Sequence, residues 1–194
     1  MEYNKAIKLK DGRTCILRNG TVQDARAVLD NFILTHAQTD FLTSYPNEVS
    51  FTLEQEEEYL RKKSESADEV EILAEVDGRV AGTAGVDRIG AYEKVKHRAG
   101  FGISIDREFW GQGIGRALTE ACIACAGVLG YAQLELEVVA ENKRAVSLYR
   151  SEGFVEYGRN PKGFRSRSSG WQELLLMRRE LDEDTEKNRT EGKT

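Results

Sequence analysis

No apolar run in the sequence approaches the roughly 20 residues that a membrane-spanning helix needs, so we expect no membrane span. The first ten residues, MEYNKAIKLK, also lack the apolar stretch of a signal peptide. Cysteine is scarce, with 3 residues in 194, which disfavours a disulfide framework and indicates a reducing, cytoplasmic location. The sequence contains no internal repeat.

Positive charge is also in short supply, since 28 Lys and Arg residues oppose 33 Asp and Glu residues, for a net charge of −5. No overall basic field would therefore gather nucleic acid. The composition, 40% hydrophobic and 31% charged, suits one folded domain with a charged surface. We expect this domain to span residues 1–181 and the polar stretch 182–194 to be a disordered tail.

Hydrophobic periodicity predicts helices and a mixed sheet, in the α/β or α+β class. Asp11-Gly12 and Asp77-Gly78 each predict a tight hairpin turn. The unbroken apolar run 174–177 predicts a strand buried on both faces. Strands are expected on both sides of the first turn and over 69–76, 79–89, 96–105, 132–139, 154–160 and 171–181, and helices over 21–36, 50–66, 113–130 and 142–153.

Three glycines, Gly111, Gly113 and Gly115, lie where a predicted strand passes into a helix. Glycine lets the backbone approach an anion, and the first turn of a helix offers unpaired N–H groups, so the pattern indicates phosphate binding. The spacing differs from the G-x-G-x-x-G of dinucleotide folds, and the preceding elements are hairpins rather than β–α repeats. No P-loop string occurs.

The segments GQGIGRAL, after the strand FGISI, and ENKRAVSLYRSEGF resemble the GCN5-related N-acetyltransferase (GNAT) family. Gly113 and Gly115 match the family's pyrophosphate loop, whereas Trp110 stands where the family has Gln or Arg. The resemblance implies a mostly antiparallel, twisted sheet of about seven strands with about four helices, splayed open at the acetyl-coenzyme A strand. It also implies that acetyl-coenzyme A is the cosubstrate and that no metal is used.

The resemblance also implies roles for individual residues. The backbone of the strand 103–105 would pair with the pantetheine arm, and one of its N–H groups would face the thioester oxygen. Residues 112–116 would supply N–H groups to the pyrophosphate. The cofactor-binding residues implied are Ile103, Ser104, Ile105, Gly111, Gln112, Gly113, Ile114, Gly115, Arg116, Asn142, Ala145 and Tyr149.

Asn142, Ala145 and Tyr149 lie on one face of the predicted helix 142–153, because seven residues make about two turns. Tyr149 matches the family's general acid, which protonates the departing thiolate. A phenol has a pKa near 10 and is neutral at pH 7, so this chemistry is feasible. A purely packing role under Phe154 is the alternative.

The general base and the acceptor stay open. Candidates for the base are Glu135, Glu137, Asp87, His97 and His36, and deprotonation through water is common in the family. The region HAQTDFLTSYPNEV, residues 36–49, would shape the acceptor pocket; Phe41 and Tyr45 could line it, and Asp40, Glu48 and Glu54 would suit a cationic amine.

The sequence therefore predicts an N-acetyltransferase that passes acetyl from acetyl-coenzyme A to a primary amine, more readily of a small molecule than of a protein. The alternative is a non-catalytic acyl-coenzyme A-binding or regulatory module of the same fold. Neither nucleic acid nor a membrane is an expected partner, and a homodimer is left open.

Cys122 and Cys125 form a C-x-x-C pair, which raises redox or zinc chemistry. Zinc needs about four ligands, and Cys15 and both histidines are remote in sequence. Both cysteines fall on the apolar stripe of the helix 113–130, so we interpret them as core residues.

Overall fold

The structure, a computed structural model, describes residues 1–48 and 50–181; the predicted tail, 182–194, lies outside the described residues. The strands are β1 (Asn4–Lys8), β2 (Thr14–Asn19), β3 (Val70–Val76), β4 (Arg79–Arg88), β5 (Arg98–Ile105), β6 (Gln133–Val139), β7 (Val155–Ser166) and β8 (Gly170–Glu180). The α-helices are α1 (Ala25–Gln38), α2 (Leu53–Glu65), α3 (Ile114–Val128) and α4 (Lys143–Ser151), with short 3-10 turns at Val22–Asp24, Pro46–Glu48 and Arg107–Phe109.

The eight strands form one sheet in the order β1-β2-β3-β4-β5-β6-β8-β7, and only the β5–β6 pair is parallel among the described residues. The predicted mixed, mostly antiparallel sheet is thus confirmed. The resemblance implied about seven strands and the structure has eight; β1 and β2 form the hairpin predicted around Asp11-Gly12.

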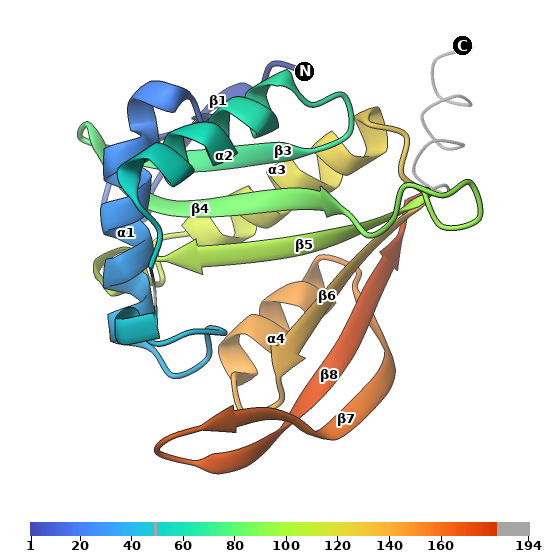
Figure 1. Ribbon diagram of the computed structural model, residues 1–194. Helices are drawn as coiled ribbons and strands as arrows, with labels where there is room; N and C mark the ends of the chain where they lie inside the picture. The colour runs from blue at the N-terminus through green and yellow to red at the C-terminus, as the bar shows by residue number, and fades with distance from the viewer. Residues whose placement is uncertain (49, 182–194) are drawn as a thin grey trace.

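β5 and β6 are paired only from Arg98–Gly100 to Gln133–Glu135. Beyond these residues the two strands diverge into the V that is visible in Figure 1. The backbone of β5 on that side therefore has no strand to pair with, which is the predicted splay.

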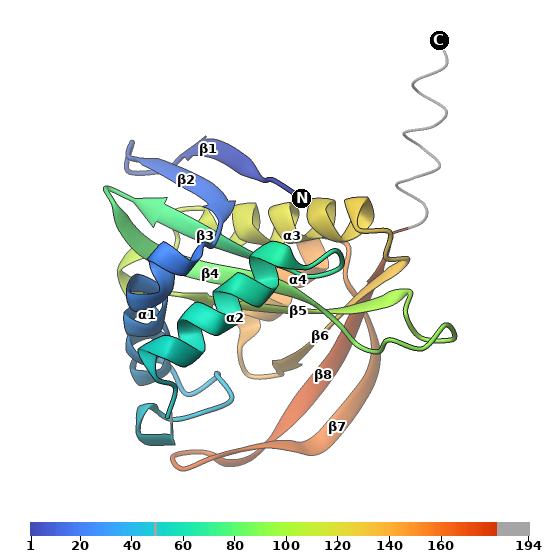
Figure 2. The same cartoon turned by 45° about the horizontal axis from the view of Figure 1, so that its top comes forward.

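Helices cover both faces of the sheet (Figures 1 and 2): α1 and α2 lie on one face, and α3 and α4 on the other. Successive side chains of β3 point to opposite faces of the sheet and so contribute to the core on each face. Ile72 and Ala74 join the core under α3, whereas Leu73 packs with Leu60 of α2 on the opposite face. Thr52 begins α2 with a reciprocal capping box to Gln55.

The apolar run in β8 is buried on one face only, which corrects the prediction for 174–177. Leu175 and Met177 are 4% and 0% exposed and face the α3–α4 core, whereas Leu174 and Leu176 are only half-buried on the other face. The reason is the splay, because it leaves that face of β6 and β8 without a covering helix. Within residues 1–48 and 50–181, none of the helices has the length and apolar character required to cross a lipid bilayer.

Candidate functional site

The glycine loop turns the chain from β5 into α3. Gly111 and Gly113 have φ values of 83° and 104°, which side-chain-bearing residues rarely adopt, and Gly113 is the N-cap of α3. The first intrahelical bond runs from the Ala117 N–H to the Gly113 carbonyl at 3.1 Å. The N–H groups of residues 113–116 therefore precede the helical ladder and are oriented for an anion, together with the positive end of the helix dipole.

Two residues of the predicted loop, Gln112 and Gly115, also have structural roles. The Gln112 N–H donates to the Phe109 carbonyl at 3.4 Å, and its side-chain oxygen accepts from the Asp11 N–H at 3.2 Å, so Gln112 braces the loop rather than offering an N–H to phosphate. At Gly115, a Cβ would lie 3.3 Å from Ile105 and 3.4 Å from Leu148, so this glycine also allows close packing of α3.

Only every second residue of β5 points its backbone N–H group toward the open edge of the strand. The Asp106 N–H bonds to Ala81 on the β4 side at 2.9 Å. Because the N–H groups of a strand alternate, Ser104 also points its N–H toward β4, and Ile103 and Ile105 point theirs into the V. Ser104 therefore does not offer its backbone to the open edge, contrary to the sequence-based expectation; its side chain lies on the α1–α2 face instead.

A cationic pair near the loop was missed in the sequence. The guanidinium groups of Arg107 and Arg144 lie 5.5 and 5.3 Å from the ring centroid of Trp110, whose indole N–H donates to the Ile105 carbonyl at 2.8 Å. Arg144 also lies 3.5 Å from the Cβ position of Gly111. Trp110 thus holds Arg144 beside the glycine loop, where its charge suits a phosphate.

Helix α4 carries the other predicted residues. The Asn142 side-chain oxygen accepts from the Ala145 N–H at 3.2 Å, so Asn142 is the N-cap of α4 and its oxygen is already engaged. That Asn142 also hydrogen-bonds the cofactor stays a prediction. Ala145 is half-buried in the next turn.

Tyr149 is 8% exposed, and its ring packs against Phe101 of β5 and Phe154, with centroid distances of 6.0 and 5.9 Å. Burial raises the pKa of the Tyr149 phenol to about 12, so the group stays protonated at pH 7. The predicted packing on Phe154 and a proton-donating role are therefore compatible.

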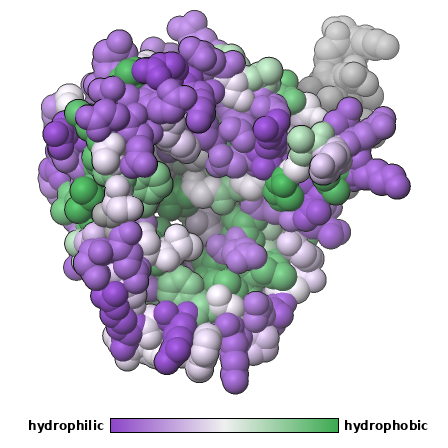
Figure 3. Space-filling model, viewed as in Figure 1, coloured by the Kyte–Doolittle hydropathy of each residue, from purple (hydrophilic) through white to green (hydrophobic). Residues whose placement is uncertain are grey.

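A cavity of about 240 Å³ lies where the strands diverge, lined by Ile89, Gly100, Phe101, Glu135, Leu136, Glu137 and Tyr157. Figure 3 shows a hollow across the middle of this face, with apolar residues gathered below it, over β6 and β8. The half-buried Leu174 and Leu176 of β8 belong to this face. The site thus joins an anion-binding loop, an unpaired strand edge and a hollow.

The sequence matches the model of the acetyltransferase (GNAT) family over residues 33–154. The chain belongs to the GNAT acetyltransferase family.

Relatives of this GNAT chain differ in how much they share with it. A ribosomal-protein-alanine N-acetyltransferase of Escherichia coli is 46% identical over 56 residues, which are 29% of this chain and 38% of that protein. A Mycobacterium leprae relative matches over 26% of its own length. The chain therefore spans less than half the length of each of these two relatives.

Solved GNAT structures share the fold. An acetyltransferase from Streptococcus pneumoniae has a TM-score of 0.82 and 26% identity, over 86% of this chain and 99% of that one. A phosphinothricin acetyltransferase from Sinorhizobium meliloti, solved in complex with acetyl-coenzyme A, has a TM-score of 0.76 and 18% identity, over 86% and 88% of the two chains.

The candidates for the general base of this GNAT domain differ in their contacts with other residues. Glu135 receives hydrogen bonds from Arg98 and Tyr157, and Arg98 holds the pKa of Glu135 below its usual range. Asp87 forms an ion pair with Lys63. His36 stacks on Phe32 at a centroid distance of 3.8 Å, and burial lowers its pKa. His97 and Glu137 are exposed, and Glu137, like Glu135, lines the cavity.

The loop between α1 and α2 is fastened to the β7–β8 hairpin. Arg167 stacks on Tyr45, with its guanidinium carbon 3.9 Å from the ring centroid. The backbone N–H of Arg167 donates to the Tyr45 hydroxyl at 2.6 Å. Arg167 also bonds to Asn47 and Glu48, and Ser168 donates to Asp40. Tyr45, Asp40 and Glu48 form this contact, which we call the loop–hairpin latch; their contact with the acceptor stays a prediction. Glu54 lies in the first turn of α2, where its backbone contacts lower its pKa.

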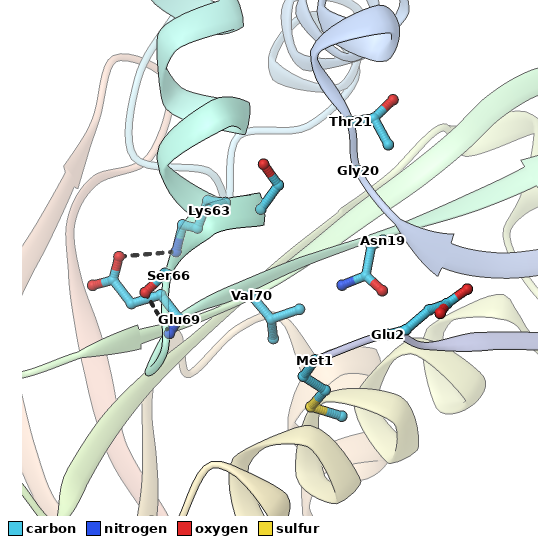
Figure 4. A pocket seen from close by; sticks show the side chains of 10 residues that line it. Met1, Glu2, Asn19, Gly20, Thr21, Lys63, Ser66, Glu69 and Val70 are labelled. Atoms are coloured by element: carbon cyan, nitrogen blue, oxygen red, sulfur yellow. Dashed lines mark hydrogen bonds and ion pairs between the residues drawn. The ribbon is translucent and has the colours of Figure 1, made fainter.

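A second cavity, of about 190 Å³, lies beside α2 and the N-terminal residues and is lined by Met1, Asn19, Thr21, Lys63 and their neighbours (Figure 4). None of the predicted cofactor-binding residues lines it. Lys63 turns its ammonium group toward Glu69 there, at 3.9 Å.

Cys122 and Cys125 are 0% exposed in the core, and Cys15 is buried as well. Burial raises the pKa of the Cys122 thiol, with the other ionisable groups contributing less, and that of Cys125 to about 11. Within the part of the chain that the structure describes, no three His, Cys, Asp or Glu residues are grouped so as to hold a metal ion. The two cysteines thus serve as small apolar residues under the sheet.

Proposed function

We propose that the protein transfers the acetyl group of acetyl-coenzyme A to the primary amine of an acceptor by direct attack. The observation that carries the proposal is the unpaired edge of β5, which leads directly to the free N–H groups at the start of α3. An extended arm ending in a pyrophosphate fits this arrangement. The acetyl-coenzyme A in the Sinorhizobium structure of the same fold supports the choice of cosubstrate.

The residues then divide the work. The N–H groups of 113–116 bind the pyrophosphate, and Arg144 adds a positive charge beside Gly111. Ile103 and Ile105 bond the arm through their backbones, and one of these N–H groups stabilises the negative charge that develops on the thioester oxygen. Tyr149, kept neutral by burial, protonates the departing thiolate.

We further propose that the acceptor is a small amine. The loop–hairpin latch ties residues 40–48 to residues 167 and 168 across the acceptor side of the site. This bridge leaves less room for an extended polypeptide than an open groove would. The E. coli relative acts on a ribosomal protein by its name, so a protein N-terminus belongs in the test set.

The test is incubation of the protein with acetyl-coenzyme A and a panel of amines, with release of free thiol as the readout. The panel should contain amino acids, polyamines, aminoglycosides and short peptides with free N-termini or lysines. We expect thiol release that depends on a small amine. Tight binding of acetyl-coenzyme A without turnover would instead identify a non-catalytic acyl-coenzyme A-binding module, and the absence of binding would refute the proposal.

A further inference from the structure

Glu71, Gly85 and Gly102 lie side by side on three adjacent strands, on the face that carries α1 and α2. Glu71 of β3 is paired with Gly85 of β4, and Gly85 is paired with Gly102 of β5. Paired residues of antiparallel strands point to the same face. The row therefore runs from a carboxyl group, over two positions without side chains, to the strand that borders the V.

The Glu71 carboxyl leans along this row. A Cβ built on Gly85 would lie 2.6 Å from Glu71 Oε2, so the carboxyl occupies the space over Gly85. Gly102 is exposed, and a Cβ there would meet nothing within 4 Å. The surface between the carboxyl and the open edge of β5 is therefore clear, and it spans about one strand spacing, ~4.8 Å.

The surroundings of Glu71 fit a group that exchanges a proton. Glu71 is 7% exposed, and the Tyr59 hydroxyl donates a hydrogen bond to Glu71 Oε2 at 3.1 Å. Burial raises the pKa of Glu71 to about 7, against the opposing effects of Lys63, Tyr59 and Thr83. The charged or titratable groups that act on it are Tyr59 and Lys63 from α2, Asp87 from β4 and, across the sheet, Cys122 from α3.

The nearest cation does not neutralise Glu71 by direct contact. The Lys63 ammonium bonds to Asp87 and to the Val86 carbonyl at 3.3 Å, and lies 3.9 Å from Glu69 (Figure 4). Two carboxylates thus share its charge. Glu71 keeps hydroxyl partners, which can bond either to the charged or to the neutral carboxyl.

The proposed acetyl transfer requires such a group, because an acceptor amine is protonated at pH 7 and must lose a proton before it attacks. Glu135 is engaged by Arg98 and Tyr157, and Asp87 is engaged by Lys63. The remaining carboxylates that border the site are Glu71 on the β3 side of Gly102 and Glu137 on the β6 side.

We propose that Glu71 accepts the proton of the acceptor ammonium through a water molecule held over Gly102, beside the carboxyl. This assignment rests on the proposed function. The ammonium gives its proton to the water, which passes one to the Glu71 carboxylate. The freed nitrogen lone pair forms the bond to the thioester carbon, the C–S bond breaks, and the sulfur takes the Tyr149 proton. The acylated nitrogen gives up its second proton, which reprotonates the Tyr149 phenolate, and Glu71 returns its proton to solvent. The net reaction converts the ammonium and acetyl-coenzyme A into the amide, the free thiol and one released proton.

The experiment measures kcat/KM between about pH 5.5 and 9 for an amine identified in the panel. It compares the wild type with Glu71→Gln and with Glu137→Gln as the matched control. In the wild type, kcat/KM should rise with pH, with a midpoint near the Glu71 pKa of about 7. Glu71→Gln should lose this rise and about 10²-fold or more of the plateau rate, with unchanged acetyl-coenzyme A affinity. Glu137→Gln should keep the rise.

A second measurement is independent of turnover and of the variant's folding. Carboxyl-carbon NMR of the wild type should show one glutamate that titrates near pH 7, assigned to Glu71 by residue-specific labelling.

Three outcomes would overturn the assignment. A rise that survives in Glu71→Gln and vanishes in Glu137→Gln would transfer the role to Glu137. A Glu71 carboxyl that titrates in the ordinary glutamate range, near 4.3, would remove its basis. A wild type that releases no thiol with any amine would refute the proposed function, and the role of Glu71 with it.

Discussion

Arg98, at the first paired position of β5, forms a two-point ion pair with Glu135, at the last paired position of β6. Arg98 Nη2 lies 2.7 Å from Glu135 Oε2, and Nε contacts the other carboxyl oxygen. Gly100 is paired with Glu135, and beyond this point the strands diverge. The ion pair therefore lies at the vertex of the V and ties its two sides together.

Replacing Glu135 should weaken this vertex. Glu135→Gln should lower the free energy of unfolding at pH 7 by about 1 kcal/mol, a modest value because the Arg98 side chain is partly exposed. Arg98 lowers the pKa of Glu135, so the stabilisation is present above the ordinary glutamate pKa and is lost as the pH falls through the lowered value. Urea unfolding at pH 7 and at pH 3 measures it, with the exposed Glu137→Gln as control. An equal loss at both pH values would contradict this explanation.

Gly113 should be needed for binding because of its backbone conformation. With φ at 104° and no neighbour within 4 Å of a Cβ, Gly113→Val meets strain rather than a clash. We expect the variant to fold, with a loss of about 1–3 kcal/mol, and to lose acetyl-coenzyme A binding in calorimetry, because the loop must relax to another conformation. Gly127→Ala, in the last turn of α3 and also without a close neighbour, is the control and should bind normally. Wild-type affinity in Gly113→Val would remove the basis for the phosphate loop.

Cys125 should matter for stability alone. Cys125→Ala truncates a fully buried side chain and should cost about 1 kcal/mol in thermal or chemical unfolding, with unchanged acetyl-coenzyme A affinity. Because burial raises the thiol pKa, the folded protein should also resist thiol reagents at pH 7. Stoichiometric zinc in the purified protein that disappears in this variant would show that the cysteine is a ligand.

The loop–hairpin latch should control the mobility of residues 40–48. Arg167→Ala removes the stacking on Tyr45 and the bonds to Asn47 and Glu48, so amide hydrogen exchange in this loop should accelerate severalfold while the core is unaffected. Arg165→Ala is a matched control, because Arg165 lies two residues away and stacks on Trp171 instead. Equal exchange in both variants would mean that other contacts hold the loop.

The order of the elements could be predicted because its signals are local. The Asp77-Gly78 turn adopts positive φ at both residues, and Gly130 and Gly153 follow the ends of α3 and α4, as glycine at a helix end predicts. The capping role of Asn142 was also readable, since Asn is favoured at a helix start.

The contacts that complete the site could not be predicted in this way. Arg98 and Glu135 are 37 residues apart, and Arg167 and Glu48 are 119 apart. Such pairs depend on how the sheet twists and where it splays. The position of Glu71 over Gly85 likewise depends on the register of two strands, although a glutamate within the apolar strand VEILAEV is a signal that a polar cluster lies beneath a helix.

If Tyr149 donates the proton to the departing thiolate, a single-turnover measurement of Tyr149→Phe should show the loss of that step. The variant keeps the ring that packs on Phe101 and Phe154 and removes only the hydroxyl. Rapid mixing of enzyme-bound acetyl-coenzyme A with the amine isolates the chemical step from product release. The rate of the variant should fall about 10²–10⁴-fold, with acetyl-coenzyme A affinity and melting temperature nearly unchanged. A wild-type rate in the variant would contradict this role and would make Tyr149 a packing residue.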